Sequence, residues 1–480
     1  MENVWKIVYS CYENEEKRAV DLLYKEAGRL LLRDWGVYSI YVLPCEKEGC
    51  ALAKNSFIVG TFDESPLIHS FVKEDEIKNK GFMIKIVENP QDSEGQIIIF
   101  TAKERVELYY AVAHFFDYFV VKYAPRIGNN RMPDHIFDNP LPKITYTEEP
   151  DNDTRSVFTW GHSINDYRAY IENMARLKLN ELIMWNDYVP VNIREVIDYA
   201  HSFGIRVVLG YSWGWKDFGE ARLLDSLTDE QINKMKDSVV EEYRNIYAPI
   251  GCDGIYFQSF TECKNEMIGG RLIARLVTDT VNDIASRLLE ITPSLRLVFG
   301  LHATSVKDRL EEIARVDERI EILWEDCGSF PYAYEPWIES EDAFNNTLEF
   351  TKKLLTLRNG KGVGLVFKGV MMMDWWHFIY QYGPYIIGAN CEDIKAHDRK
   401  IRERGWKIYS GEWAQHGKWA HKLYEFVKNN KISQINTCLA GTFDGGIYLP
   451  VAASANMLRS LSPYDETLKK VTQAPFVELG

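Results

Sequence analysis

The sequence predicts an α/β protein in which a (β/α)8 barrel of the TIM type follows a smaller α/β layer domain. Three observations support this prediction. Strand-like and helix-like segments alternate from residue 156 onward, and the strand-like segments number eight. A Pro-, Asn- and Asp-rich stretch, Pro125–Asp153, separates them from a first part of different character. Because 480 residues exceed what one hydrophobic core usually supports, we expect domains at 1–145 and 150–480.

The first domain is predicted from short runs that are rich in β-branched and aromatic residues, as strands are. A longer stretch, Lys103–Val121, carries apolar residues at helical spacing and predicts an amphipathic helix. No group of residues in this part suggests catalysis. The expected strands are Val4–Ser10, Val37–Leu43, Phe57–Thr61, Phe82–Val87 and Gln96–Thr101.

The second domain is predicted from apolar strand-like runs with amphipathic helices between them, the pattern of a parallel sheet built from βα units. An open doubly wound sheet is the alternative, because a sequence pattern does not reveal whether strands close into a ring. The segment Ala389–Asn430 fits either a long helical crossover or a further strand. The expected strands are Val157–Gly161, Glu181–Trp185, Arg206–Tyr211, Gly254–Phe260, Arg296–Leu301, Glu321–Trp324, Gly364–Met372 and Ile435–Ala440.

Composition limits the classes of function. The net charge of −14 disfavours nucleic acid as a partner, since backbone phosphates are bound by clustered Lys and Arg. No apolar run is long enough to span a bilayer, and the first residues are too charged for a signal peptide, so we expect a cytoplasmic protein. The eight cysteines form no Cys-x-x-Cys pair and are expected to be free thiols. The oligomeric state stays open, with a homodimer as one option.

In barrels of this type the catalytic groups lie where strands end and βα loops begin. At these positions the sequence places mostly aromatic rings, carboxylates and histidines. Sugar rings stack their C–H faces on aromatic rings and bind carboxylate, amide and imidazole groups through their hydroxyls, so this combination indicates a carbohydrate site. The expected substrate-binding residues are Trp160, His162, Trp185, Asp187, Tyr211, Trp213, Trp215, His302, Trp324, Trp375, His377 and Asp444.

Four acids are candidates for catalysis: Glu262, Glu325, Asp326 and Asp374. Glycosidic cleavage typically uses two carboxyl groups, one to protonate the leaving oxygen and one to attack or to activate water. Glu262 ends the apolar run Ile-Tyr-Phe-Gln-Ser-Phe-Thr and is the expected proton donor. Glu325 and Asp326 would point to opposite sides of a strand, so only one would line the pocket.

A metal site is a weaker interpretation of the same residues. His162, His302 and His377 could together bind a metal ion, but no two of them have the i, i+4 spacing of a helical zinc pair. We expect them to bind sugar hydroxyls or to be satisfied in the core, and we expect no cofactor.

Several stretches resemble two known families of glycoside hydrolases. The segment Arg155–Trp215, which includes Tyr-Ser-Trp-Gly-Trp at 211–215, is similar to the opening of the barrels of the family 20 β-N-acetylhexosaminidases and the family 67 α-glucuronidases. Gly81–Phe119 resembles the end of the α/β domain that precedes those barrels. The resemblance implies a carbohydrate substrate and an acid at Glu262.

The same resemblance includes departures that bear on the substrate. Family 20 has an Asp-Glu pair where this chain has Thr261-Glu262, and the Asp orients the substrate's acetamido group. Family 67 has Ser-Glu there and a uronate-binding lysine where this chain has Gln258, although Lys368 could substitute for it. We therefore expect an exo-acting glycosidase, and the missing Asp favours an inverting one. The alternatives are an inactive carbohydrate-binding protein and a metal-dependent barrel hydrolase.

Overall fold

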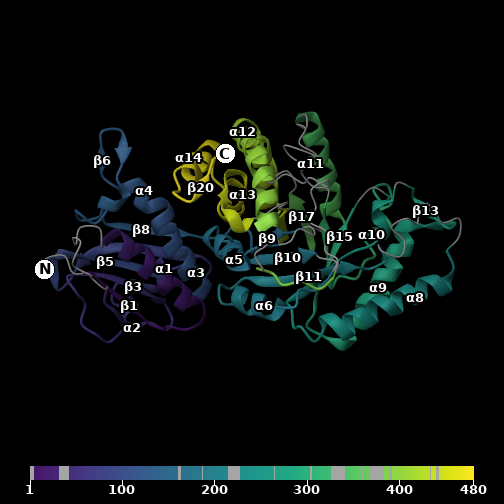
Figure 1. The fold of residues 1–480 in the computed structure, drawn as a ribbon, viewed down its shortest axis with the longest axis horizontal. Coiled ribbons are helices and arrows are strands. Elements are labelled where there is room, and N and C mark those ends of the chain that lie inside the picture. Colours follow the sequence, from purple (N-terminus) through teal and green to yellow (C-terminus); the bar gives the residue numbers. More distant parts are fainter. Residues whose placement is uncertain are drawn as a thin grey trace.

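The computed structural model describes residues 5–31, 43–159, 164–185, 188–214, 227–263, 265–302, 305–325, 341–358, 361–367, 383–388, 392–432, 434–438 and 443–479. Within these ranges the chain forms a six-stranded sheet followed by a closed barrel (Figure 1).

The first sheet has the strand order β2-β1-β3-β5-β4-β8, with β4 antiparallel to both of its neighbours. Alternate residues of β3, a central strand of this sheet, face opposite sides. Phe57 and Val59 pack on the side of the sheet that carries the long helices, and Ile58 packs on the other side. Four of the five expected strands are present, and the fifth, Val37–Leu43, lies almost entirely outside the described residues. The strands are β1 (Trp5–Tyr9), β2 (Cys45–Lys47), β3 (Asn55–Thr61), β4 (Phe82–Asn89), β5 (Asp92–Ala102) and β8 (Ile144–Glu148).

The helices of this part include the predicted amphipathic stretch, which runs through α3 (Arg105–His114), a π-helical turn at Phe115–Phe119 and α4 (Val120–Tyr123). α1 (Asn14–Leu31) packs beside α3, and the short α2 (Pro66–His69) lies on the opposite face of the sheet. The expected linker, Pro125–Asp153, was wrong in part, since β8 lies within it. The polar composition misled because β8 is an edge strand, exposed at alternate residues.

The second sheet is a closed parallel barrel, which confirms the predicted fold class and excludes an open sheet. The last strand pairs with the first, with Thr437 opposite Val157. All eight expected strands are present, although β9 begins at Thr154 rather than at Val157. The strands are β9 (Thr154–Phe158), β10 (Glu181–Trp185), β11 (Arg206–Ser212), β12 (Gly254–Gln258), β15 (Arg296–Leu301), β16 (Ile320–Trp324), β17 (Val363–Phe367) and β18 (Gln434–Cys438).

Helices surround the barrel, and two of them show clear start signals. Asp166 caps α5 by accepting hydrogen bonds from the backbone of Arg168 and Ala169, and Thr228 with Gln231 forms a capping box on α8. The segment Ala389–Asn430 is mostly one long helix, α12, so the crossover interpretation was right. The helices are α5 (Tyr167–Arg176), α6 (Ile193–His201), α8 (Asp229–Glu242), α9 (Ile273–Ile291), α10 (Leu310–Ile313), α11 (Glu341–Thr356), α12 (Glu392–Asn429), α13 (Leu449–Arg459) and α14 (Tyr464–Thr472).

Short strand pairs complete the described secondary structure. They are β6 (Arg126–Ile127) with β7 (Asn130–Arg131), β13 (Met267–Ile268) with β14 (Arg271–Leu272), and β19 (Ile447–Tyr448) with β20 (Val477–Glu478).

The barrel interior is filled in layers, because every second residue of a strand points inward. The seven described side chains of the middle layer are apolar apart from one hydroxyl group, that of Tyr256. At the amino-terminal ends of the strands, Glu181 forms ion pairs with Arg206 and Arg296. Since β10 and β15 are not neighbours, the Glu181–Arg296 pair crosses the interior. The middle layer consists of Phe158, Ile183, Val208, Tyr256, Val298, Leu323 and Val366.

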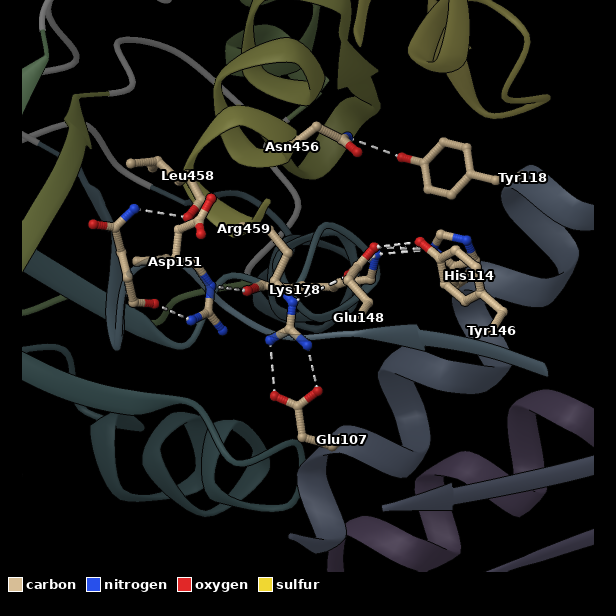
Figure 2. A network of polar contacts seen from close by, with 12 residues as sticks. Glu107, His114, Tyr118, Tyr146, Glu148, Asp151, Lys178, Asn456, Leu458 and Arg459 are labelled. Carbon is tan, nitrogen blue, oxygen red and sulfur yellow. Dashed lines mark hydrogen bonds and ion pairs between the residues drawn. The ribbon is translucent and has the colours of Figure 1, made fainter. Parts of the chain in front are cut away.

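The first sheet and the barrel share a buried polar cluster, here called the interface network: Glu107, His114, Glu148, Lys178 and Arg459 (Figure 2). Arg459, at the end of α13, donates two hydrogen bonds to Glu107 of α3, at 2.8 and 2.5 Å. Glu148 of β8 pairs with Arg459 at 3.1 Å and with Lys178 at 3.0 Å. Burial alone would raise the pKa of Glu148, but Lys178 and the neighbouring cations hold that pKa well below its usual range. The division of the chain into domains at 145–150 stays a prediction. The interface network joins the two parts through buried ion pairs.

Candidate functional site

The candidate site lies at the carboxyl-terminal ends of the barrel strands, one layer above the apolar interior. The alternation that points Ile183, Tyr256 and Leu323 inward also points the residues two positions later inward, which are Trp185, Gln258 and Glu325. His302 follows β15 directly and contacts Glu325. Strands that are far apart in sequence thus bring together the side chains of Trp185, Gln258, His302 and Glu325.

Glu325 is the centre of this group. Its side chain is fully buried, at 0% exposure. Gln258 donates its amide Nε2 to both carboxylate oxygens, at 2.8 and 2.7 Å, and the Nε2 of His302 lies 2.9 Å from Oε2. The hydroxyl of Tyr256 also donates to Oε1. A buried carboxylate is tolerated only when donors of this kind surround it.

Two glycines make room for these side chains. A Cβ atom at Gly300 would collide with both the Glu325 carboxylate and the Tyr256 hydroxyl. A Cβ atom at Gly210 would lie 2.8 Å from the ring of Trp185. Trp185 is half-buried, and its ring meets that of Tyr256 edge-on, with centroids 5.6 Å apart. The indole therefore lies directly above the interior layer.

Glu262 ends a short 3-10 turn, Phe260–Glu262, that begins two residues after β12. The turn is anchored to the loop after the next strand, because Ser305 donates both its backbone N–H and its hydroxyl to the carbonyl of Thr261. This backbone position is at the carboxyl-terminal end of the fourth barrel strand, as expected. The side chain of Glu262 lies outside the description.

Three rings that were expected to bind sugar pack instead in the layer between barrel and helices, so their position gives that predicted role no support. Trp213 is 0% exposed and stacks flat on Phe257, with centroids 3.5 Å apart. Tyr211 is buried, stacks on Tyr247 and donates its hydroxyl to the carbonyl of Val239; burial raises its pKa well above 10. Trp324 is buried against Phe350. All three have the outward parity of their strands.

Other expected residues remain untested. Of Asp444, only the backbone is described, in the turn Phe443–Gly445. Among the described residues, no group of three or more His, Cys, Asp and Glu side chains is arranged to hold a metal ion. The residues that lie outside the described ranges are Trp160, His162, Asp187, Trp215, Asp326, Lys368, Asp374, Trp375 and His377.

Tyr256 was not predicted to belong to the site. Gln258 was noted in the sequence only because it stands where the family 67 enzymes have a lysine. The available signal was parity: each barrel strand presents every second residue inward, so β12, two strands away from Glu325, must present either Tyr256 and Gln258 or their alternates. None of the described helices is both long and apolar enough to cross a bilayer.

Comparison with known proteins gives a match in structure alone. No family model matches the chain, and no curated protein matches its sequence. The chitobiase of Flavobacterium johnsoniae superposes with a TM-score of 0.50 at 10% identity, over 97% of this chain and 68% of the chitobiase. The family 20 β-N-acetylhexosaminidase of Streptomyces coelicolor A3(2) gives a TM-score of 0.47 at 11% identity, over 98% of this chain and 87% of that enzyme.

Some matched proteins are considerably longer. This chain spans 57% of the structure described as CpGH84D and 53% of a family 89 glycoside hydrolase from Clostridium perfringens, with TM-scores of 0.45 and 0.46 at 13% and 12% identity. The match with CpGH84D includes 76% of this chain, and the match with the family 89 enzyme includes 98% of it. At these identities the likeness concerns the fold alone, and the fold of this chain resembles that of the Flavobacterium johnsoniae chitobiase.

Proposed function

We propose that this protein is an exo-acting glycoside hydrolase that removes a terminal sugar by acid and base catalysis at the barrel mouth. The observation that carries the proposal is the fully buried Glu325 carboxylate, held by Gln258 and His302 one layer above the apolar interior. The glycoside hydrolase fold of the chain supports the same interpretation.

A purely structural role explains Glu325 poorly. The layer directly below it is filled by apolar side chains such as Leu323 and Val298. Removing a carboxylate from water costs several kcal/mol, and apolar residues of similar volume are often as stable or more so. Groups that are costly to bury cluster at functional sites. We therefore propose that the Glu325 carboxylate is buried there because it serves catalysis or substrate binding.

In the proposed reaction, Glu262 protonates the glycosidic oxygen as the bond to the anomeric carbon breaks. A second carboxylate activates the attacking water or attacks directly, and Glu325, Asp326 and Asp374 are its candidates. Retaining enzymes need the two carboxyl groups about 5 to 5.5 Å apart, and inverting ones need about 6.5 to 9.5 Å. The missing Asp beside Glu262 favours inversion. Trp185 is the described aromatic ring best placed to stack on the sugar.

The residues around Glu325 bear on which class of sugar is the substrate. The side chain of Gln258 is a neutral amide that donates to that carboxylate, so it offers a uronate neither a positive charge nor this hydrogen bond. Thr261 stands where an acetamido-orienting Asp would be, and its backbone carbonyl is bound to Ser305. A chromogenic panel with β-N-acetylglucosaminides, α-glucuronides and neutral hexosides separates these classes.

The test of the proton donor uses leaving groups of different acidity. Replacing Glu262 by Gln should lower kcat/KM by about 100- to 10,000-fold for a poor leaving group and far less for dinitrophenol, which needs no proton. Glu266→Gln is the matched control, since Glu266 is 41% exposed and forms only a surface pair with Arg309. Equal losses for both leaving groups would contradict the role. Sugar binding without turnover in wild type would indicate a binding protein.

A further inference from the structure

Among the seven described side chains of the middle layer, that of Tyr256 is the one with a hydroxyl, and its contacts suggest a purpose. We propose that Tyr256 is a positioning residue that fixes the Glu325 carboxylate against the imidazole of His302. Its consequence for catalysis rests on the proposed function, whereas the contacts themselves do not.

The first step concerns packing. Tyr256 is 0% exposed, and its ring packs against Phe158 at 4.7 Å and edge-on against Trp185. A phenylalanine would make the same ring contacts without placing a hydroxyl in the barrel interior. A buried hydroxyl is costly unless it is hydrogen-bonded. This one donates to Oε1 of Glu325 and lies 3.3 Å from the amide nitrogen of Gln258.

The second step concerns the carboxylate oxygens. Oε1 accepts from Tyr256 and Gln258, and Oε2 accepts from Gln258 and lies 2.9 Å from His302 Nε2. An ionised carboxylate only accepts hydrogen bonds, so donors on both oxygens favour the anion. The anion in turn favours a proton on Nε2 of His302. Glu325 therefore acts through the imidazole as a fixed negative charge, rather than as an attacking nucleophile.

The third step concerns the glycine on the strand between Tyr256 and Glu325. Gly300, on the strand between β12 and β16, lacks the Cβ atom that would overlap both the Tyr256 hydroxyl and the Glu325 carboxylate. Any larger residue would push these two groups apart or out of the layer. The glycine is thus required by the same contact that the proposal assigns to Tyr256.

The experiment follows the ring signals of His302 by NMR at one fixed pH, in protein labelled at histidine with carbon-13, using a His302→Gln variant to assign them. Among the described residues, the ionisable group in contact with this imidazole is Glu325 of β16, and the hydroxyl of Tyr256 contacts that carboxylate. Glu325→Gln should shift these signals, because the charge that pairs with Nε2 is lost. Tyr256→Phe should shift them in the same direction but by less, because the carboxylate loses a donor that fixes it against the imidazole.

Tyr243→Phe is the matched control. Tyr243 is equally buried and loses one hydrogen bond, to Thr292 at 2.8 Å, but it lies outside the barrel. The proposal requires unchanged His302 signals in this variant. If Tyr256→Phe behaves like Tyr243→Phe, the proposal is wrong. If Tyr256→Phe does not fold, Gly300→Ala replaces it, and unchanged His302 signals there would contradict the proposal equally.

A kinetic arm connects the contact to the proposed function. On a glycoside that the wild type cleaves, the acidic limb of the kcat/KM profile should move to higher pH in Tyr256→Phe and stay in place in Tyr243→Phe. A limb that stays in place in both variants would overturn the positioning role in catalysis. If the wild type cleaves no glycoside, the proposed function fails, whereas the NMR comparison of the variants still decides whether Tyr256 positions Glu325.

Discussion

The interface network makes a quantitative prediction for the stability of the whole chain. The perturbation is Glu148→Gln, which removes one negative charge from a site with Lys178 at 3.0 Å, Arg459 at 3.1 Å and His114 at 3.4 Å. Lys470 lies further away, at 3.9 Å. The amide is similar in size to the carboxylate, so the change acts mainly on charge.

The magnitude follows from burial. The side chain of Glu148 is 3% exposed, and those of Lys178 and Arg459 are 4% and 2% exposed. Breaking a buried ion pair from one side typically costs about 3 to 5 kcal/mol, since the remaining charge loses its partner. Arg459 keeps its two hydrogen bonds to Glu107, so we expect a loss near the lower end, about 3 kcal/mol.

The assay is urea unfolding followed by circular dichroism and by tryptophan fluorescence. Coincident transitions are expected, because the network joins the first sheet to the barrel. The control is Glu149→Gln, one residue later, whose side chain is 52% exposed and 3.8 Å from Lys78. It should change the free energy of unfolding by less than about 0.5 kcal/mol. The reasoning is refuted if Glu148→Gln and Glu149→Gln lose the same small amount.

Three further predictions follow from buried positions. Trp213→Ala should destabilise the protein by about 3 to 5 kcal/mol, measured by urea unfolding, because the ring is 0% exposed and stacked on Phe257; unchanged stability would restore it as a candidate sugar platform. Trp185→Ala should instead raise KM for the cleaved glycoside while leaving the unfolding midpoint closer to that of wild type, and an unchanged KM would count against stacking at Trp185. Burial lowers the pKa of Lys178 to about 8, below its usual 10.5, so the unfolded chain binds more protons between those values. Stability should therefore gain a contribution as pH rises from 8 to 10.5, and Lys178→Met should lose it when unfolding is measured across this range.

Much of the barrel could be predicted because its strands are short apolar runs bounded by clear breaks. Glu181–Trp185 and Arg296–Leu301 match their predicted limits. Long amphipathic helices between strands leave few topologies other than a parallel sheet. Closure depends on the pairing of β18 with β9, residues far apart in sequence, which no local pattern records.

The site was harder to predict because inward and outward positions alternate along each strand. Trp213 and Trp324 occupy strand ends, but both have the parity that faces the helices. A shift of one residue moves a side chain from the barrel mouth to the core, and aromatic residues suit both places. Glu325 was a candidate on position alone, and the donors from Gln258 and Tyr256 emerge only when β12 and β16 are placed around β15.

The interface network was not predictable for a related reason. Arg459 and Glu148 are 311 residues apart in the chain, and neither lies in a motif. A Glu at the end of an edge strand is usually solvated, so no local pattern indicates that this one is buried. Burial here depends on Arg459, at the end of α13, reaching Glu148 of β8 and Glu107 of α3, which is tertiary structure.

The central claim is tested most directly by the turnover of Glu325→Gln on a glycoside that the wild type hydrolyses. The control is Glu318→Gln, an exposed residue that precedes the same strand. We predict that kcat/KM falls by about 100- to 1,000-fold in Glu325→Gln, as for the loss of a preorganised charge, and by less than about twofold in the control. A wild-type enzyme whose turnover is unchanged by Glu325→Gln would contradict the assignment of this buried carboxylate to the active site.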